Sequence, residues 1–139
     1  MIVSAALLRS VRELSSWAAG RRRRFRVTGP SMMPTLADGE FVLVDTSDRP
    51  QAGDLALATH PDNDVMVVKR VTEQLADGRF VVMSDNPEGS DSRTWGPLGA
   101  ERVRGRVTLI LDRPLAPLSA PEEPARRPAT GGWARWLRR

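Results

Sequence analysis

The sequence contains no cysteine and no tyrosine, one histidine (His60) and, among 21 basic side chains, one lysine (Lys69). Without cysteine there is no thiol nucleophile, disulfide or thiolate metal site, and one histidine excludes a multi-histidine metal site. Acid–base chemistry near neutral pH therefore falls to His60, the carboxylates or Lys69. Lysine can lose its proton when it is buried, whereas arginine effectively never does.

The 139 residues suffice for one domain with tails, and the net charge of +4 is unevenly distributed. Residues 1–28 carry a net charge of +6, residues 29–112 carry −6 and residues 113–139 carry +4. An acidic centre between basic ends is not typical of a domain that grips nucleic acid on one face, so we expect no nucleic-acid partner. Basic ends of this kind are typical of solvated tails or membrane-surface contacts.

Residues 3–19 predict a helix, because apolar residues recur at steps of three and four. These residues are Val3, Leu7, Val11, Leu14 and Ala18. The apolar stretch Ala5–Leu8 is too short to span a bilayer. The segment also lacks the order of a secretory signal, in which a long apolar run follows basic residues. Four arginines follow at 21–24, so the predicted unit, residues 1–26, is an amphipathic helix with an Arg-rich segment. It either lies on an anionic membrane with its apolar face down or packs on its own domain.

Residues 27–112 predict β structure, because short Val-rich runs alternate with Gly, Pro, Asp and Asn turn signals. The predicted strands are residues 40–45, 54–59, 64–72, 79–84 and 102–111. We expect a mainly β, compact, antiparallel and barrel-like domain with a short N-terminal helix. Residues 113–139 predict a Pro-rich linker and a basic tail that contains tryptophan.

Three segments carry residues suited to chemistry. Ser31 lies between Pro30 and Pro34, which restrict the backbone on both sides. A hydroxyl on a stiff loop suits a nucleophile, because a small misplacement of the attacking atom is costly. A serine in such a loop is more often only a turn residue.

Lys69 lies in the second segment, on a predicted strand where it shares a face with Val65, Val67 and Val71. Burial of that face would desolvate the amine and lower its pKa. A neutral amine can accept the proton of a serine hydroxyl. The alternative is an edge-strand lysine whose stem crosses apolar surface to reach water. The third segment, residues 84–98, is a dense polar loop. It could orient the amine and be made rigid by its Asp–Arg pair, or it could be an ordinary solvated loop.

In this order, the three segments resemble the type I signal peptidase superfamily of Ser–Lys proteases over residues 27–107. The matching elements are Ser31-Met32-Met33-Pro34-Thr35-Leu36, Val68-Lys69-Arg70-Val71 and Ser84-Asp85-Asn86 followed by Ser90-Asp91-Ser92-Arg93-Thr94-Trp95-Gly96. The resemblance implies that Ser31 is the nucleophile and Lys69 the general base. It also implies that the Ser31 backbone N–H helps to form the oxyanion hole. The remaining implied roles are a groove contact for Met32, orientation of Lys69 by Ser90, and stabilisation of the polar loop by Asp91 and Arg93.

The sequence departs from that superfamily in three ways. Gly29 stands where a hydroxyl residue usually completes the oxyanion hole, and Thr28 is the nearest substitute. The polar segment is one residue shorter than usual between Ser90 and Asp91. The sequence shows no transmembrane anchor and no large insertion after Lys69.

This compact form resembles the maturation proteases of nickel-type superoxide dismutase. That resemblance implies removal of the N-terminal propeptide of a nickel superoxide dismutase precursor, the expected protein partner, by an enzyme that itself needs no metal or other cofactor. We expect a cytoplasmic protein, with peripheral contact at the inner face of the membrane as an open alternative.

Three other functions stay open. One is general signal-peptidase-like processing of exported proteins. Another is self-cleavage of the kind found in repressor-type Ser–Lys proteases, which cut an Ala-Gly bond such as that between Ala19 and Gly20; the same pair also predicts a helix end. The last is a non-enzymatic β-barrel module that uses its Arg-rich ends to bind nucleic acid or membrane. Such binding would depend on salt concentration and would survive loss of Ser31.

Overall fold

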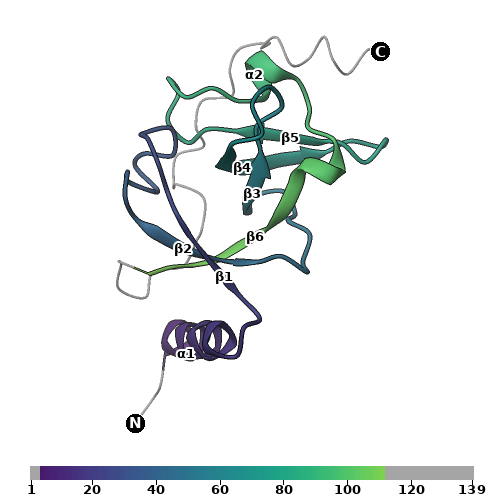
Figure 1. The fold of residues 1–139 in the computed structure, drawn as a ribbon. Helices are drawn as coiled ribbons and strands as arrows, with labels where there is room; N and C mark the ends of the chain where they lie inside the picture. The colour runs from purple at the N-terminus through teal and green to yellow at the C-terminus, as the bar shows by residue number, and fades with distance from the viewer. Residues whose placement is uncertain (1–3, 112–139) are drawn as a thin grey trace.

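The computed structural model describes residues 4–111. Helix α1 (Ala5–Ala18) precedes five strands, and a short helix and a 3-10 turn precede the sixth (Figure 1). In chain order after α1, the elements are β1 (Arg23–Arg26), β2 (Phe41–Asp45), β3 (Leu55–Thr59), β4 (Met66–Gln74), β5 (Phe80–Met83), α2 (Ser92–Trp95), η1 (Ala100–Arg102) and β6 (Val103–Ile110). The predicted mainly β class with an N-terminal helix is confirmed.

The strands form one antiparallel sheet in the order β1-β2-β6-β3-β4-β5. Register shifts interrupt the pairing of β2 with β6, of β3 with β6 and of β4 with β5, and such irregularities bend and twist a sheet. Within residues 4–111, β1 and β5 are the two edges and do not pair with each other, so a closed barrel is not observed. Figure 1 shows α1 below the crossing of β1, β2 and β6, with β3, β4 and β5 at the other end.

The sheet separates two apolar clusters, and strand β3 contributes to both because successive side chains point to opposite faces. Leu55 and Leu57 enter the first cluster, which also contains Met32. Ala56 and Ala58 enter the second, which is built around Phe80. All five residues of β3 are buried, so this strand and its neighbour β4 form the rigid centre of the molecule.

The five predicted strands all occur, whereas β1, α2 and the 3-10 turn η1 have no counterpart among the predicted elements. Strand β1 lies in the segment assigned to the helix and arginines, and three of its four side chains are exposed arginines, which are common on edge strands. Helix α2 has only four residues, too few for a helical period, and is capped by Asp91, which accepts from the Arg93 N–H. The predicted linker and tail, residues 113–139, lie outside the described residues.

Helix α1 follows the predicted bounds closely, with Ser4 as its N-cap. The helix packs on its own domain through a polar face, since the side chains it buries are Ser10, Glu13 and Ser16. Glu13 accepts a hydrogen bond from Arg22 Nε at 2.6 Å. Among the described residues, no helix has the length and apolar content needed to cross a membrane.

Candidate active site

Lys69 is enclosed because β4 is an internal strand. It pairs with Ala56 on β3, and its side chain is 3% exposed. Its Nζ lies 5.6 Å from the centroid of the Trp95 ring. Burial lowers the pKa of Lys69 from its ordinary 10.5 to about 8, Asp91 opposes this shift and Arg93 adds to it. Lys69 is therefore not an edge-strand lysine that reaches water.

The valines that share its face are buried unequally. Val71 is fully enclosed and Val67 half-buried, but Val65 is 56% exposed. The expected apolar face is therefore enclosed at Val71 and open at Val65, which precedes β4. Trp95 at the end of α2 also lies beside the Lys69 amine.

The hydroxyl bonded to Lys69 belongs to Ser84. Lys69 Nζ donates to Ser84 Oγ at 2.9 Å, and Ser84 Oγ donates to the Ser90 carbonyl at 3.0 Å. The resemblance implies that Ser90 orients Lys69; in this structure the Ser84 hydroxyl is bonded to the amine, and Ser90 accepts from Ser84 through its backbone carbonyl. The strand register contained the signal, since Arg70 pairs with Met83 and places Ser84 beside Lys69.

Gly89 brings the Ser31 loop against this pair. A Cβ at Gly89 would lie 2.5 Å from Ser84 Oγ and 2.9 Å from Ser31 Cβ, closer than real side-chain contacts allow. Ser31 and Ser84 therefore border the same small space. Ser84 is also the hydrogen-bond partner of Lys69, so the space that Ser31 borders adjoins the side chain that holds the predicted base.

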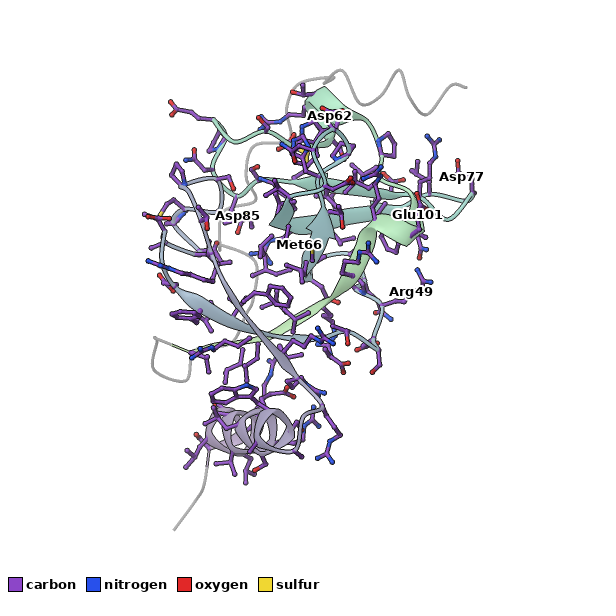
Figure 2. The ribbon with its side chains drawn as sticks, viewed as in Figure 1. Arg49, Asp62, Met66, Asp77, Asp85 and Glu101 are labelled. Atoms are coloured by element: carbon purple, nitrogen blue, oxygen red, sulfur yellow. The ribbon has the colours of Figure 1, made fainter. Side chains whose placement is uncertain are left out.

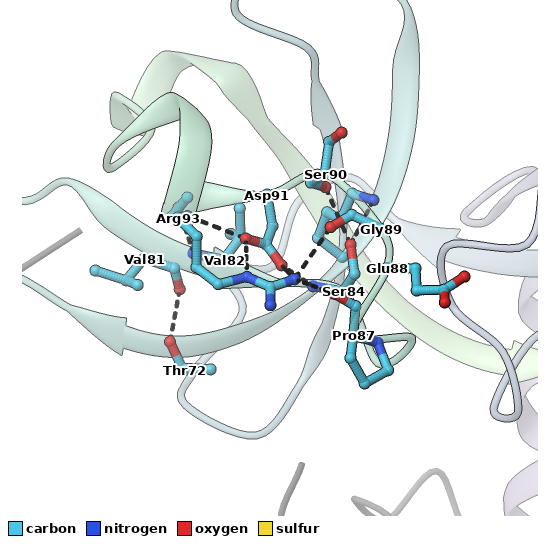
Figure 3. Close-up of polar contacts among 12 residues, drawn as sticks. Thr72, Val81, Val82, Ser84, Pro87, Glu88, Gly89, Ser90, Asp91 and Arg93 are labelled. Atoms are coloured by element: carbon cyan, nitrogen blue, oxygen red, sulfur yellow. Dashed lines mark hydrogen bonds and ion pairs between the residues drawn. The ribbon is translucent and has the colours of Figure 1, made fainter. Parts of the chain in front are cut away.

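Asp91 and Arg93 organise the polar loop (Figure 3). Asp91 is fully buried; it accepts from Arg93 Nε and Nη2, both at 2.9 Å, and from the Ser84 N–H at 2.8 Å. Arg93 also donates to the carbonyls of Pro87 and Gly89. This ion pair fixes the backbone that carries Ser84, and Asp91 raises the pKa of Arg93.

The Ser31 loop is held by the start of the same polar loop. Asn86 donates its N–H to the Ser31 carbonyl at 2.9 Å and its side-chain amide to the Pro30 carbonyl at 3.1 Å. The Asp85 N–H donates to Met32 Sδ at 3.4 Å. Five residues from two distant segments thus form one unit, which is stiffer than the flanking prolines alone would make it.

Arg70 and Asp85 connect this unit to the sheet. Arg70 forms two hydrogen bonds to the Asp85 carboxylate, at 3.0 and 2.7 Å, and a third to the Gly53 carbonyl at 2.7 Å. Thr35, four residues after Ser31, donates to Asp85 at 2.5 Å. One buried ion pair therefore links β4, the loop before β3, the polar loop and the Ser31 loop.

Gly29 adopts a φ of +85°, a conformation that strains residues with a side chain. Its N–H donates to Asp38 Oδ1 at 2.8 Å. This explains why glycine stands where the resemblance leads one to expect a hydroxyl residue. Thr28 is exposed and borders the pocket described next.

A pocket of about 180 Å³ opens beside Ser31, between β1 and the start of β4. It is mainly apolar, and Met32 lines it, as the resemblance implies. Its full lining is Phe25, Arg26, Val27, Thr28, Ser31, Met32, Leu57, Val65, Met66, Val67 and Val68. Met66 of β4 and Asp85 after β5 are labelled in Figure 2. An apolar pocket with few polar groups is typical of a site that binds a side chain of a partner.

His60 takes no part in the Ser31–Ser84–Lys69 arrangement. Its ring meets the Trp95 ring edge to face at 4.5 Å, and its Nδ1 accepts the Asp62 N–H at 3.1 Å. His60 therefore supports the tryptophan that covers Lys69. Within residues 4–111, no group of three or more His, Asp or Glu side chains is arranged to hold a metal ion.

A buried lysine of lowered pKa, a serine on a stiff loop and an adjoining apolar pocket define the class of Ser–Lys peptidases. Residues 11–107 match the Peptidase S24-like family, and the chain belongs to that family. The match extends from the middle of α1 into β6 and so includes every residue of the arrangement above. No curated protein matches the chain significantly.

Proposed function

We propose that this protein is a serine endopeptidase in which Ser31 attacks the scissile carbonyl and Lys69 accepts the Ser31 proton. The observation that carries the proposal is the burial of the only lysine, with its pKa lowered to about 8, beside the loop that holds Ser31. At pH 7, about a tenth of Lys69 is neutral and able to act as a base.

The chemistry follows the usual order of acyl transfer. Ser31 Oγ forms a bond to the carbonyl carbon as its proton passes to Lys69 Nζ. The Ser31 N–H, with Thr28, stabilises the resulting oxyanion. Protonated Lys69 then gives its proton to the leaving amine. Water, deprotonated by Lys69, attacks the acyl-enzyme and releases Ser31. Ser84 keeps the amine aligned throughout.

The proposed substrate is the N-terminal propeptide of a nickel superoxide dismutase precursor, bound with an apolar side chain in the pocket beside Ser31. The sequence resemblance to the maturation proteases supports this choice. So does the compact connection after Lys69, where β4 returns to β5 through a short turn without an inserted domain.

The test is to mix the purified protein with that precursor and read the N-terminus of the product by mass spectrometry. We expect one cut with the wild type and none with Ser31→Ala or Lys69→Ala. Ser15→Ala, which changes an exposed serine on α1, is the matched control and should cleave normally. Undiminished cleavage by folded Ser31→Ala would refute the mechanism. Failure to cut this precursor while another peptide is cut would refute only the substrate.

Self-cleavage between Ala19 and Gly20 is a second candidate, favoured by the exposure of both residues at the end of α1, within the part matched to the family. It predicts that the protein alone yields a fragment beginning at Gly20. A rate independent of protein concentration would indicate cleavage within one chain. Gly20→Trp should then block this cut and leave cleavage of a precursor intact.

A further inference from the structure

Helix α1 exposes most of the large apolar side chains that are open to solvent among residues 4–111. Five of the eight lie on this one helix: Leu7, Leu8, Val11, Leu14 and Trp17, which are 39 to 60% exposed. The other three, Met33, Val65 and Met66, lie in the Ser31 loop or line its pocket. A contiguous apolar surface of this kind on a soluble domain marks an interaction site.

The packing of α1 shows that this exposure is built into the fold. The face turned to the sheet is polar, with Ser10, Glu13 and Ser16 at three-residue steps, all at most 5% exposed. Arg22 bridges Glu13 at 2.6 Å and Asp45 at 3.3 Å, so the contact with the domain is an ion-pair network. An amphipathic helix that served only the core would bury its apolar stripe instead.

The charges around the stripe have one sign. Glu13, the only acidic residue between Ser4 and Arg26, is buried and paired. Six exposed arginines remain in the same segment: Arg9, Arg12, Arg21, Arg23, Arg24 and Arg26. Arg24 lies over the rings of Trp17 and Phe41, at 5.8 and 4.6 Å from their centroids. The guanidinium carbon of Arg24 makes both contacts, so a positive charge lies on aromatic rings beside the apolar stripe.

We propose that α1 and the arginines of 21–26 dock this protein on an anionic lipid surface, with Leu7, Val11 and Leu14 inserted among the headgroups. The apolar stripe gains by leaving water, and the arginines gain by approaching anionic phosphates. A nucleic acid would neutralise the arginines but would leave the apolar stripe in water, so a lipid surface fits both features better. The docking is independent of peptidase activity, and Ser31→Ala should bind as the wild type does.

Flotation of the full-length protein with vesicles tests the proposal. We expect binding to phosphatidylcholine vesicles that contain a quarter phosphatidylglycerol, and much weaker binding to pure phosphatidylcholine or in high salt. Leu7→Gln/Val11→Gln/Leu14→Gln should lower the partition coefficient at least tenfold with an unchanged unfolding midpoint, because these side chains are exposed. The matched control, Trp133→Gln/Trp136→Gln in the C-terminal segment, should keep most of the binding.

A charge pair sharpens the test. Arg9→Gln should weaken binding about fivefold, whereas Arg49→Gln, labelled in Figure 2 away from α1, should not. Absence of binding by the wild type overturns the proposal, and that result does not depend on any variant. Full binding by the triple variant also overturns it. So does a wild-type dimer in sedimentation velocity that the triple variant abolishes, or binding to duplex DNA without binding to vesicles, since each identifies another occupant.

Discussion

At the residue scale, Ser84 fits beside position 89 only because that residue is glycine. The Ser84 hydroxyl occupies space that a Cβ at position 89 would need, and it holds the Lys69 amine. We predict that Ser84→Ala lowers kcat by about 100-fold, because an amine displaced by an ångström is poorly placed for proton transfer. Gly89→Ser should be inactive because its side chain collides with Ser84 and Ser31.

The double variant Ser84→Gly/Gly89→Ser separates positioning from packing. It removes the collision with Ser84, leaves the milder one with Ser31 Cβ, and returns a hydroxyl to the space beside Lys69, so kcat should recover at least partly relative to either single change. Steady-state kinetics on the precursor measure this. If the fold-loss of kcat in the double variant equals the product of the fold-losses in the two single variants, the hydroxyl has no positioning role in that space.

The pKa of Lys69 fixes the pH dependence of activity. Because the neutral amine is the active form, kcat/KM should rise with pH and level off above a midpoint near 8. Among side chains the profile points to Lys69, since the chain has no cysteine, no tyrosine and no other lysine, and blocking the α-amino group, which titrates near 8, removes the one other candidate.

Lys69→Arg should lose activity across the whole pH range although it keeps a positive charge, because arginine does not give up its proton. Arg79→Lys, in the exposed β4–β5 turn, is a control that adds a lysine elsewhere. An active Lys69→Arg variant, or a flat pH profile in the wild type, would exclude Lys69 as the base.

At the scale of elements, the Arg70–Asp85 pair joins β4, the polar loop and the Ser31 loop. Both side chains are at most 7% exposed and share two hydrogen bonds. Asp85→Asn leaves the Arg70 charge buried without its counter-charge, so we predict a loss of about 3 kcal/mol in the free energy of unfolding, with activity reduced as the Ser31 loop loosens.

Asp77→Asn is the matched control, because it breaks an Asp–Arg pair in which Asp77 is 52% and Arg79 33% exposed. Exposed pairs contribute little, so the urea midpoint should hardly move. If Asp85→Asn and Asp77→Asn lower the urea midpoint equally, the buried Arg70–Asp85 pair contributes no more to stability than an exposed pair.

The elements that sequence patterns predict are those whose residues carry their own signal. The Val-rich run of β4 and the apolar repeat of α1 are local features, and both elements form where expected. Strand β1 is set by its pairing with β2, and Arg23, Arg24 and Arg26 give it no apolar alternation. The polar face that α1 turns to the sheet depends on Arg22 and Asp45, which helical periodicity does not include.

At the scale of the whole molecule, the site combines residues that sequence motifs identify with contacts that only folding creates. Ser31 and Lys69 stand in recognisable motifs, and the resemblance places them in one site. The partner of Lys69 follows from the β4–β5 register, and its cover follows from the docking of α2, where Ser92 accepts the Val82 N–H. Ser84 and Trp95 were therefore present in the polar segment without a predicted role.

The same buried amine has a consequence for the stability of the whole fold. The pKa of Lys69 is about 8 in the folded chain and near 10.5 when unfolded, so between these values the unfolded chain binds the additional proton. Stability must then increase with pH across this window, and below pH 8 the buried amine costs the fold up to about 3 kcal/mol. Lys69→Met places there a side chain of similar length that carries no charge whose burial would destabilise the fold.

We therefore predict that Lys69→Met abolishes activity yet unfolds at higher urea than the wild type at pH 7, and that the difference shrinks steadily from pH 8 to 10.5. Urea titrations of both proteins at several pH values measure it. Contributions from the remaining groups cancel in the difference. A variant less stable at pH 7, or a difference independent of pH, would mean that burial does not lower the pKa of Lys69 and that the folded protein keeps the amine charged well above pH 8. Lys69 would then be an anchor of the polar loop through Asp91 and not a base.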